Sequence, residues 1–139
     1  MFQLSIVTPE KVAHEIEVKS LVVPGTEGYL GVLSNHAPLI TALKPGRIEF
    51  ADSEDNVILM AVSGGFLEVS NNQATILADA VELADEIDID RAQAAYDRQK
   101  ARLIEGGDGE NDIDLPRARA SMERAANRIK VYKQAHEKH

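Results

Sequence analysis

The sequence contains no cysteine, which excludes a disulfide framework and any metal or redox site built on thiolates. Aromatic residues make up only 4% of it and tryptophan is absent, so few flat side chains are offered for stacking on bases or sugars. Basic residues are outnumbered, with 15 Lys and Arg against 23 Asp and Glu and a formal net charge of -8. Because nucleic acids and anionic lipids attract clustered positive charge, neither is an expected partner.

Long apolar runs are missing as well. No stretch approaches the roughly 18 apolar residues that a membrane span requires, and the start, Met1–Leu4, lacks the basic and apolar regions of a secretory signal. We therefore expect a soluble chain that reaches a membrane only through other proteins. Its 139 residues suffice for one domain of typical size or two small ones.

What is present divides into two halves with different patterning. From Phe2 to Val81, short apolar runs and alternating apolar and polar residues are interrupted by Gly, Pro or Asn roughly every ten residues. About seven or more short strands of this kind are typical of an antiparallel β-sandwich or barrel. Turns are expected at 24–28 and 70–73, and Gly31 inside an apolar run indicates a close approach of the backbone.

From Ile87 onward the sequence is rich in Ala, Arg and Gln at spacings of three and four, which predicts two helices separated by the glycine-rich link 105–111. The two helices are related by an internal repeat with an offset of 26 residues, in which the segment beginning at Ile87 matches the segment beginning at Ile113. In each copy an aspartate, Asp88 or Asp114, stands where a helix N-cap belongs.

The expected fold is therefore α+β with two domains, an antiparallel β-sandwich or barrel at 1–84 followed by an antiparallel α-helical hairpin at 85–139. The facing seams of the two helices are narrow and rich in alanine, as in a coiled coil. Because a buried alanine removes little apolar area from water, the hairpin should be weakly held. The seam residues are Leu115, Ala118, Met122, Ala125, Ile129 and Tyr132 in the second helix, and Ala92, Tyr96 and Leu103 in the first, with Ala95 and Ala101 alongside.

No motif indicates catalysis, and we expect that the chain is not an enzyme. The P-loop signature is absent, the four histidines lack metal-ligand spacing, and no Ser or carboxylate pair is placed for catalysis. His36, close to Pro38 in a turn, is more often a structural hydrogen-bonding group than a site residue.

Arginines provide the main candidate site of the helical half. They recur at helical intervals in both copies of the repeat: Arg91, Arg98 and Arg102, then Arg117, Arg124 and Arg128. Folded together, the helices can present several guanidinium groups to one phosphate, aided by a helix N-terminus. The alternative is that the arginines form a solvated helix face and that Asp88 is only a cap.

The last helix also carries a positive charge on an acidic chain. From Arg117 to His139 there are 7 Lys and Arg against 2 Asp and Glu. These cations either suit the negative end of the helix dipole or prepare the helix, once detached, for docking on an acidic partner surface.

One long spaced pattern in the first half is Pro24-Gly25-Thr26-Glu27-Gly28, Gly31, Leu33, His36-Ala37-Pro38 and Leu43-Lys44-Pro45-Gly46. With this pattern, and with a sandwich followed by a helical hairpin, the chain resembles the epsilon subunit of F-type ATP synthases over essentially its whole length. The resemblance implies a non-catalytic subunit of the rotating central stalk, whose sandwich binds the gamma subunit and the ring of c subunits. It also implies a hairpin that lies folded or extends along gamma, where its last helix meets the beta and alpha subunits and blocks ATP hydrolysis.

The same resemblance implies ATP as a regulatory ligand that stabilises the folded hairpin, and it leaves the role of Mg²⁺ open. The family's motif Ile/Leu-Asp-x-x-Arg-Ala is matched at the start of the first helix. The implied roles are phosphate contacts for the arginines, polar contacts for the acids, and contacts with the base or sugar for the apolar residues. The implied ATP-binding residues are Glu82, Ile87, Asp88, Arg91, Ala92, Arg98, Arg124 and Arg128.

The resemblance places the chain peripherally on the cytoplasmic face of the bacterial cell membrane, held there by the complex. Two other interpretations stay open. One is a purely structural coupling subunit without ATP sensing, in which the hairpin is a passive brace. The other is a free-standing module that binds a small molecule and shares only the sandwich fold.

Overall fold

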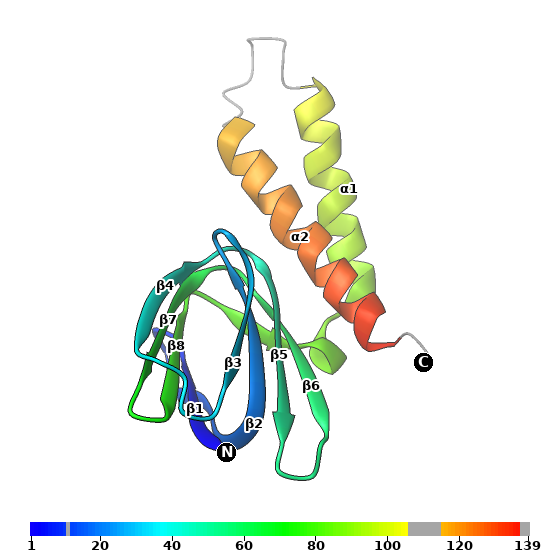
Figure 1. Cartoon of the computed structure of the whole chain (residues 1–139). Helices are drawn as coiled ribbons and strands as arrows, with labels where there is room; N and C mark the ends of the chain where they lie inside the picture. Colours follow the sequence, from blue (N-terminus) through cyan, green and yellow to red (C-terminus); the bar gives the residue numbers. More distant parts are fainter. Residues whose placement is uncertain (11, 106–114, 137–139) are drawn as a thin grey trace. The chain divides into compact units, whose positions relative to one another are not determined.

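A computed structural model of the chain describes residues 1–10, 12–105 and 115–136. The chain divides into two compact units, Met1–Leu83 and Ala84–His139. The first consists of strands and the second of helices (Figure 1). Each unit is described by itself.

The first unit is a nine-stranded sheet that closes partly on itself. Its strands are β1 (Phe2–Val7), β2 (Val12–Gly25), β3 (Gly28–Leu33), β4 (Leu39–Leu43), β5 (Gly46–Asp52), β6 (Val57–Val62), β7 (Gly65–Ser70), β8 (Gln73–Ala78) and β9 (Val81–Leu83). They follow the order β1-β8-β7-β4-β2-β5-β6-β9, and β3 pairs with β2. Because β1 also pairs with β2, the strands β1, β8, β7, β4 and β2 form a ring.

The predicted antiparallel arrangement is confirmed with one exception. β1 and β8 run parallel, from Gln3 opposite Gln73 to Val7 opposite Leu77. The ring itself explains the exception, because an odd number of strands cannot alternate in direction all the way round. The apolar pattern of a single strand does not show whether the sheet closes into a ring.

Alternating side chains build the core of this unit. In β5, Ile48 and Phe50 are buried as the alternation predicts. Not every apolar side chain of the strands faces this core, since Val57 is 62% and Phe66 is 56% exposed. The largest fully buried side chains are Phe50, Leu4, Ile6, Leu21, Ile48, Met60, Leu67, Ile76, Val18, Val23, Val32 and Val62.

Two of the sequence-based expectations for turns have different outcomes. The turn expected at 70–73 is confirmed, since Asn71 and Asn72 have φ of 53° and 59°, which suits a tight two-residue hairpin. The turn expected at 24–28 is shorter, because β2 continues to Gly25 and β3 begins at Gly28.

The close backbone approach expected at Gly31 is wrong. A Cβ atom built there would meet nothing within 4 Å. Gly65 is the residue with that role. Its φ is 145°, and a Cβ would collide with the carbonyl oxygen of Leu77 and lie 2.9 Å from the Cα of Ala78.

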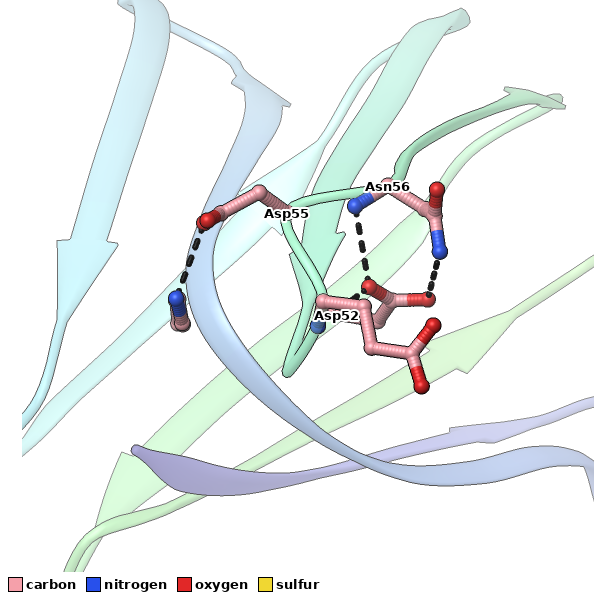
Figure 2. Close-up of polar contacts among 5 residues, drawn as sticks. Asp52, Asp55 and Asn56 are labelled. Atoms are coloured by element: carbon pink, nitrogen blue, oxygen red, sulfur yellow. Dashed lines mark hydrogen bonds and ion pairs between the residues drawn. The ribbon is translucent and has the colours of Figure 1, made fainter.

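A single carboxylate organises the β5–β6 turn (Figure 2). Asp52 Oδ1 accepts hydrogen bonds from the backbone amides of Glu54 and Asn56, both at 2.9 Å, and Oδ2 accepts one from Asn56 Nδ2 at 3.2 Å. The hydrogen bond from the backbone amide of Asn56 is the main reason that the pKa of the Asp52 carboxyl lies below its usual value. The neighbouring ion pair between Lys19 and Asp55, at 2.9 Å, is exposed and contributes little stability.

The second unit contains a short 3₁₀ turn, η1 (Ala84–Glu86), and two helices, α1 (Ile89–Glu105) and α2 (Leu115–Ala135). The expected pair of helices is confirmed, and they run antiparallel (Figure 1). The η1 turn was not predicted, and α1 begins after Asp88 rather than at Ile87. The non-helical link expected at 105–111 is wrong for Glu105, which is the last residue of α1, and its other residues lie outside the described part of the chain. The second cap, Asp114, lies outside it as well.

The predicted seam is confirmed for three of its alanines, and it is wrong for Leu115, which is 38% exposed, and for Ala101. Ala92, Ala118 and Ala125 are buried, at 0%, 6% and 4% exposure. Ala101 is exposed and does not belong to the seam. Gln99 is buried, at 8% exposure, and the apolar pattern missed it.

We predict that Gly65→Ala destabilises the first unit by about 3 kcal/mol, because it combines a disfavoured φ with a backbone collision. Gly31→Ala is the matched control, and it should leave the free energy of unfolding within about 1 kcal/mol of the wild type. Urea unfolding of both variants measures the difference. Equal stabilities would contradict the assigned conformation of Gly65.

Candidate functional site

The candidate site begins at the cap of α1. The backbone N–H of Arg91 donates to Asp88 Oδ1 at 3.1 Å, and the N–H of Ala92 donates to the Asp88 carbonyl at 3.0 Å. Asp88 is therefore the N-cap of α1, as the sequence predicts. Its carboxylate is exposed to solvent, so capping leaves part of it accessible.

The arginines of the repeat occupy equivalent places on the two helices. Each directly precedes a residue of the seam in the sequence, and all are exposed except Arg128, which is half-buried. On α1 these arginines are Arg91, Arg98 and Arg102, and on α2 they are Arg117, Arg124 and Arg128.

Helix geometry turns this spacing into a common flank. Consecutive residues of an α-helix are about 100° apart, so a residue that precedes a seam position projects to one side of the seam. α1 and α2 pack against each other in antiparallel directions (Figure 1). When two antiparallel helices face each other, the residue that precedes a seam residue projects to the same side of the seam on both helices. All the arginines of the repeat therefore flank the seam on one side, which we call the arginine flank.

The two helices also place these arginines at matching heights. α1 ends at Glu105 and α2 begins at Leu115, so residues that are equally far from these ends lie level with each other. Arg98 then lies within about one turn of Arg124, and Arg91 within about one turn of Arg128. The arrangement offers paired guanidinium groups across the hairpin.

The two sides of the seam differ in charge. Within α1 and α2 the arginine flank also includes Ala95, Ser121 and the buried Val131, and its one carboxylate is Glu105, which lies seven residues after Arg98. The opposite side carries both signs, with Asp97 and Glu123 beside Lys100 and Arg119, as is typical of a solvated face. The excess of arginine on the flank is what an anion site requires.

The remaining predicted site residues are placed differently. Ile87 and Ala92 are buried, at 5% and 0% exposure, and so have a packing role. Glu82 belongs to the first unit, where it is half-buried in β9 opposite Ala61 of β6. Ligand contacts by these side chains stay predictions.

The end of α2 is tied to η1 within the helical unit. The ring of His136 stacks on Tyr132 with the centroids 4.1 Å apart, and its Nδ1 lies 2.8 Å from the Tyr132 carbonyl. Its Nε2 lies 3.7 Å from Asp85 Oδ1 of η1. These contacts, which the sequence did not indicate, hold the last turn of α2 near the start of the hairpin.

Gln99 was missed because an amide is read as a surface group. It lies on the spacing of the α1 seam, between Tyr96 and Leu103, and this spacing was the available signal. Its Oε1 is buried and accepts no hydrogen bond. The seam therefore contains a polar group that the folded hairpin does not satisfy.

A second candidate surface lies on the first unit. Ile40, Phe66 and Leu77 are exposed at 74%, 56% and 53%, and they come from the adjacent strands β4, β7 and β8. Phe66 lies directly opposite Leu77 and also opposite Ala42. Neighbouring exposed apolar side chains of this kind mark contact surfaces for other proteins.

Other kinds of site find no support in the described part of the chain. Over residues 1–10, 12–105 and 115–136, no group of three His, Cys, Asp or Glu side chains could hold a metal ion. Neither described helix has the length and apolar character needed to cross a membrane. His36 Nδ1 lies 2.7 Å from the Ala37 carbonyl, in agreement with the structural role expected for it.

Comparisons with known proteins point to one family over both units. A model described as "ATP synthase, Delta/Epsilon chain, beta-sandwich domain" matches residues 1–84, and one described as "ATP synthase, Delta/Epsilon chain, long alpha-helix domain" matches residues 85–133. The ATP synthase epsilon chain of Desulforamulus reducens is 46% identical over 129 residues, which cover 93% of this chain and 95% of the relative. That of Moorella thermoacetica is 45% identical over 128 residues, covering 92% and 93%.

Solved structures show the same fold. The mitochondrial ATP synthase of Euglena gracilis, OSCP/F1/c-ring, contains a chain that matches with a TM-score of 0.77 and 19% identity, over 95% of this chain and 78% of that one. The central stalk/c-ring of the Tetrahymena thermophila mitochondrial ATP synthase gives a TM-score of 0.61 at 13% identity, over 97% and 96%. At these identities the likeness is one of fold.

We predict that Asp88→Ala destabilises the helical unit by about 1 kcal/mol, because the amide of Arg91 loses its acceptor. Asp88→Asn is the matched control, since its side-chain oxygen can still cap the helix, and it should cost clearly less. Thermal unfolding followed by circular dichroism at the helix band measures both. Equal losses in the two variants would show that the charge of Asp88, rather than its cap, stabilises the unit.

Proposed function

The chain belongs to the family of ATP synthase delta/epsilon chains, and on this premise we propose that it is a rotor subunit whose helical hairpin responds to ATP. As a member of that family it is a non-catalytic, accessory subunit of the complex. The observation that carries the proposal is the arginine flank, which brings three arginines of α1 and three of α2 to one side of the seam.

ATP is the ligand that suits this flank. Its phosphates carry several negative charges, and a guanidinium group can bind two phosphate oxygens at once. Arg91 and Arg98 come from α1, whereas Arg124 and Arg128 come from α2. A phosphate chain bound between them joins the two helices, so ATP binds the closed hairpin better than an open one. Asp88 lies at the base of α1, where its exposed carboxylate can contact a polar group of the nucleotide.

Because ATP binds the closed hairpin better than the open one, it keeps the hairpin closed, and we call this arrangement a latch. A ligand that prefers one of two conformations shifts the population towards it. With ATP the hairpin stays folded, and without ATP the helices separate and extend. The described α2 has one acid, Glu123, among six basic residues, so the extended helix can dock on an acidic surface of the catalytic head and inhibit ATP hydrolysis.

The first unit supplies the contact with the rest of the complex. Its exposed apolar side chains on β4, β7 and β8 suit a neighbouring subunit, for which gamma and the c-ring are the proposed candidates. The chain would then be held peripherally on the cytoplasmic face of the membrane by the complex, rather than by a segment of its own. ATP here is a regulatory ligand and not a substrate.

A purely structural role is the second candidate, and the geometry of Asp88 favours it. Asp88 caps α1 through the amide of Arg91, so a motif aspartate is explained without any nucleotide. In that case ATP should not change the stability of the hairpin. The Asp88→Asn variant, which can keep the cap, should then behave as the wild type does with and without ATP.

We predict that the double variant Arg98→Ala, Arg124→Ala binds ATP at least about tenfold more weakly than the wild type, because one phosphate contact is lost on each helix. Isothermal titration calorimetry of the full chain, with and without Mg²⁺, measures the affinity. Arg119→Ala is the control, since Arg119 is exposed on α2 but follows the seam residue Ala118 and lies off the arginine flank. The ATP latch is wrong if the wild type binds no ATP at millimolar concentration, or if Arg119→Ala weakens binding as much as the double variant.

A further inference from the structure

Gln99 is the polar member of a seam that is otherwise built from apolar side chains. It is buried, at 8% exposure, in the middle of α1, and α1 packs against α2. The seam residues at the same spacing on α1 are Ala92, Tyr96 and Leu103, all buried or half-buried. Gln99 therefore enters the interface between the helices and does not point into solvent.

The folded hairpin leaves this side chain unsatisfied. Gln99 Oε1 is buried and accepts no hydrogen bond. In an open hairpin the same oxygen is hydrated, so its desolvation opposes closure and nothing in the closed state compensates for it. The opposing contribution of the seam is small, because the buried residues around it are alanines such as Ala118 and Ala125.

We propose that Gln99 is a built-in weak point of the hairpin, which keeps the closed state only marginally stable so that a bound ligand can decide between closed and open. The destabilisation of the closed hairpin follows from the burial of Gln99 alone, whereas its role in regulation rests on the function proposed above. An apolar side chain at position 99 would close the hairpin with no ligand present. A fully satisfied amide would have the same effect, which is why the missing donor matters.

The test is amide hydrogen exchange of the full chain without nucleotide, comparing the wild type with Gln99→Leu. Leucine has a helix propensity close to that of glutamine and removes the buried oxygen. Exchange of the α1 and α2 amides reports the free energy of opening the hairpin. We expect their protection to rise roughly tenfold or more in the variant, while the amides of the first unit are unchanged.

Gln93→Leu is the matched control, because Gln93 lies on the exposed surface of α1 and its side chain bonds only to Asp97, at 3.1 Å. It makes the same chemical change outside the seam and should not raise the protection. Gln99→Met is the second variant, since an unbranched side chain adapts to the space even where leucine does not fit. Unchanged or reduced protection in both Gln99 variants would overturn the proposal.

The assembled complex separates this inference from the proposed function. If the Gln99 variants close the hairpin and also relieve inhibition of ATP hydrolysis, both are supported. If they close the hairpin and hydrolysis stays the same, the weak point stands and the inhibitory role fails. If hydrolysis changes while the protection of the hairpin does not, the inference about Gln99 is contradicted.

Discussion

The seam between α1 and α2 is the contact on which the rest of this account depends. Its buried members are mainly alanines, and each of them removes little apolar area from water. One further member, Gln99, carries a buried oxygen without a donor. A seam of this kind can close, but it supplies little free energy beyond what closure costs. Small contributions at its ends and along its side therefore have large effects on the population of the closed state.

Three groups of residues act on this balance. Asp88 caps the first turn of α1, and His136 and Tyr132 hold the last turn of α2 near Asp85. Along the side, the arginine flank places Arg98 of α1 and Arg124 of α2 at about the same level, and an anion bound between these like charges would favour closure. Under the function proposed above, that anion is ATP.

The first unit is built on the opposite principle. Its core is filled by Phe50, Leu21, Met60 and other large side chains, all fully buried, and β2 bonds to strands on both of its edges. Such a core unfolds as a whole and not in parts. A rigid unit for attachment and a marginal unit for regulation suit the two roles proposed for the chain.

Local rules predicted much of this structure from the sequence. The Asp88 cap, the asparagine turn at 70–73 and the alternation in β5 each follow from a few neighbouring residues, and all three are confirmed. The parallel pairing of β1 with β8 depends on ring closure, which no single strand records. Gly31 and Gly65 could not be told apart in sequence, because the difference lies in what packs above each of them.

The positions of the arginines could be predicted to the same extent and for the same reasons. Helical spacing was enough to put Arg91 and Arg98 on one face, whereas the common flank with Arg124 required the antiparallel pairing of the two helices. Gln99 was missed because a polar residue at a seam position violates the pattern that was used to find the seam. Such violations are expected where function opposes stability.

The most direct measurement is the rate of ATP hydrolysis by the assembled complex when this chain is truncated after Pro116, which removes most of α2 and leaves the first unit intact. At low ATP, where the wild-type hairpin is open and inhibitory, the account predicts faster hydrolysis by the truncated complex. At high ATP, where the hairpin is closed, the two rates should converge. Equal rates at every ATP concentration would contradict the claim that the hairpin regulates the enzyme.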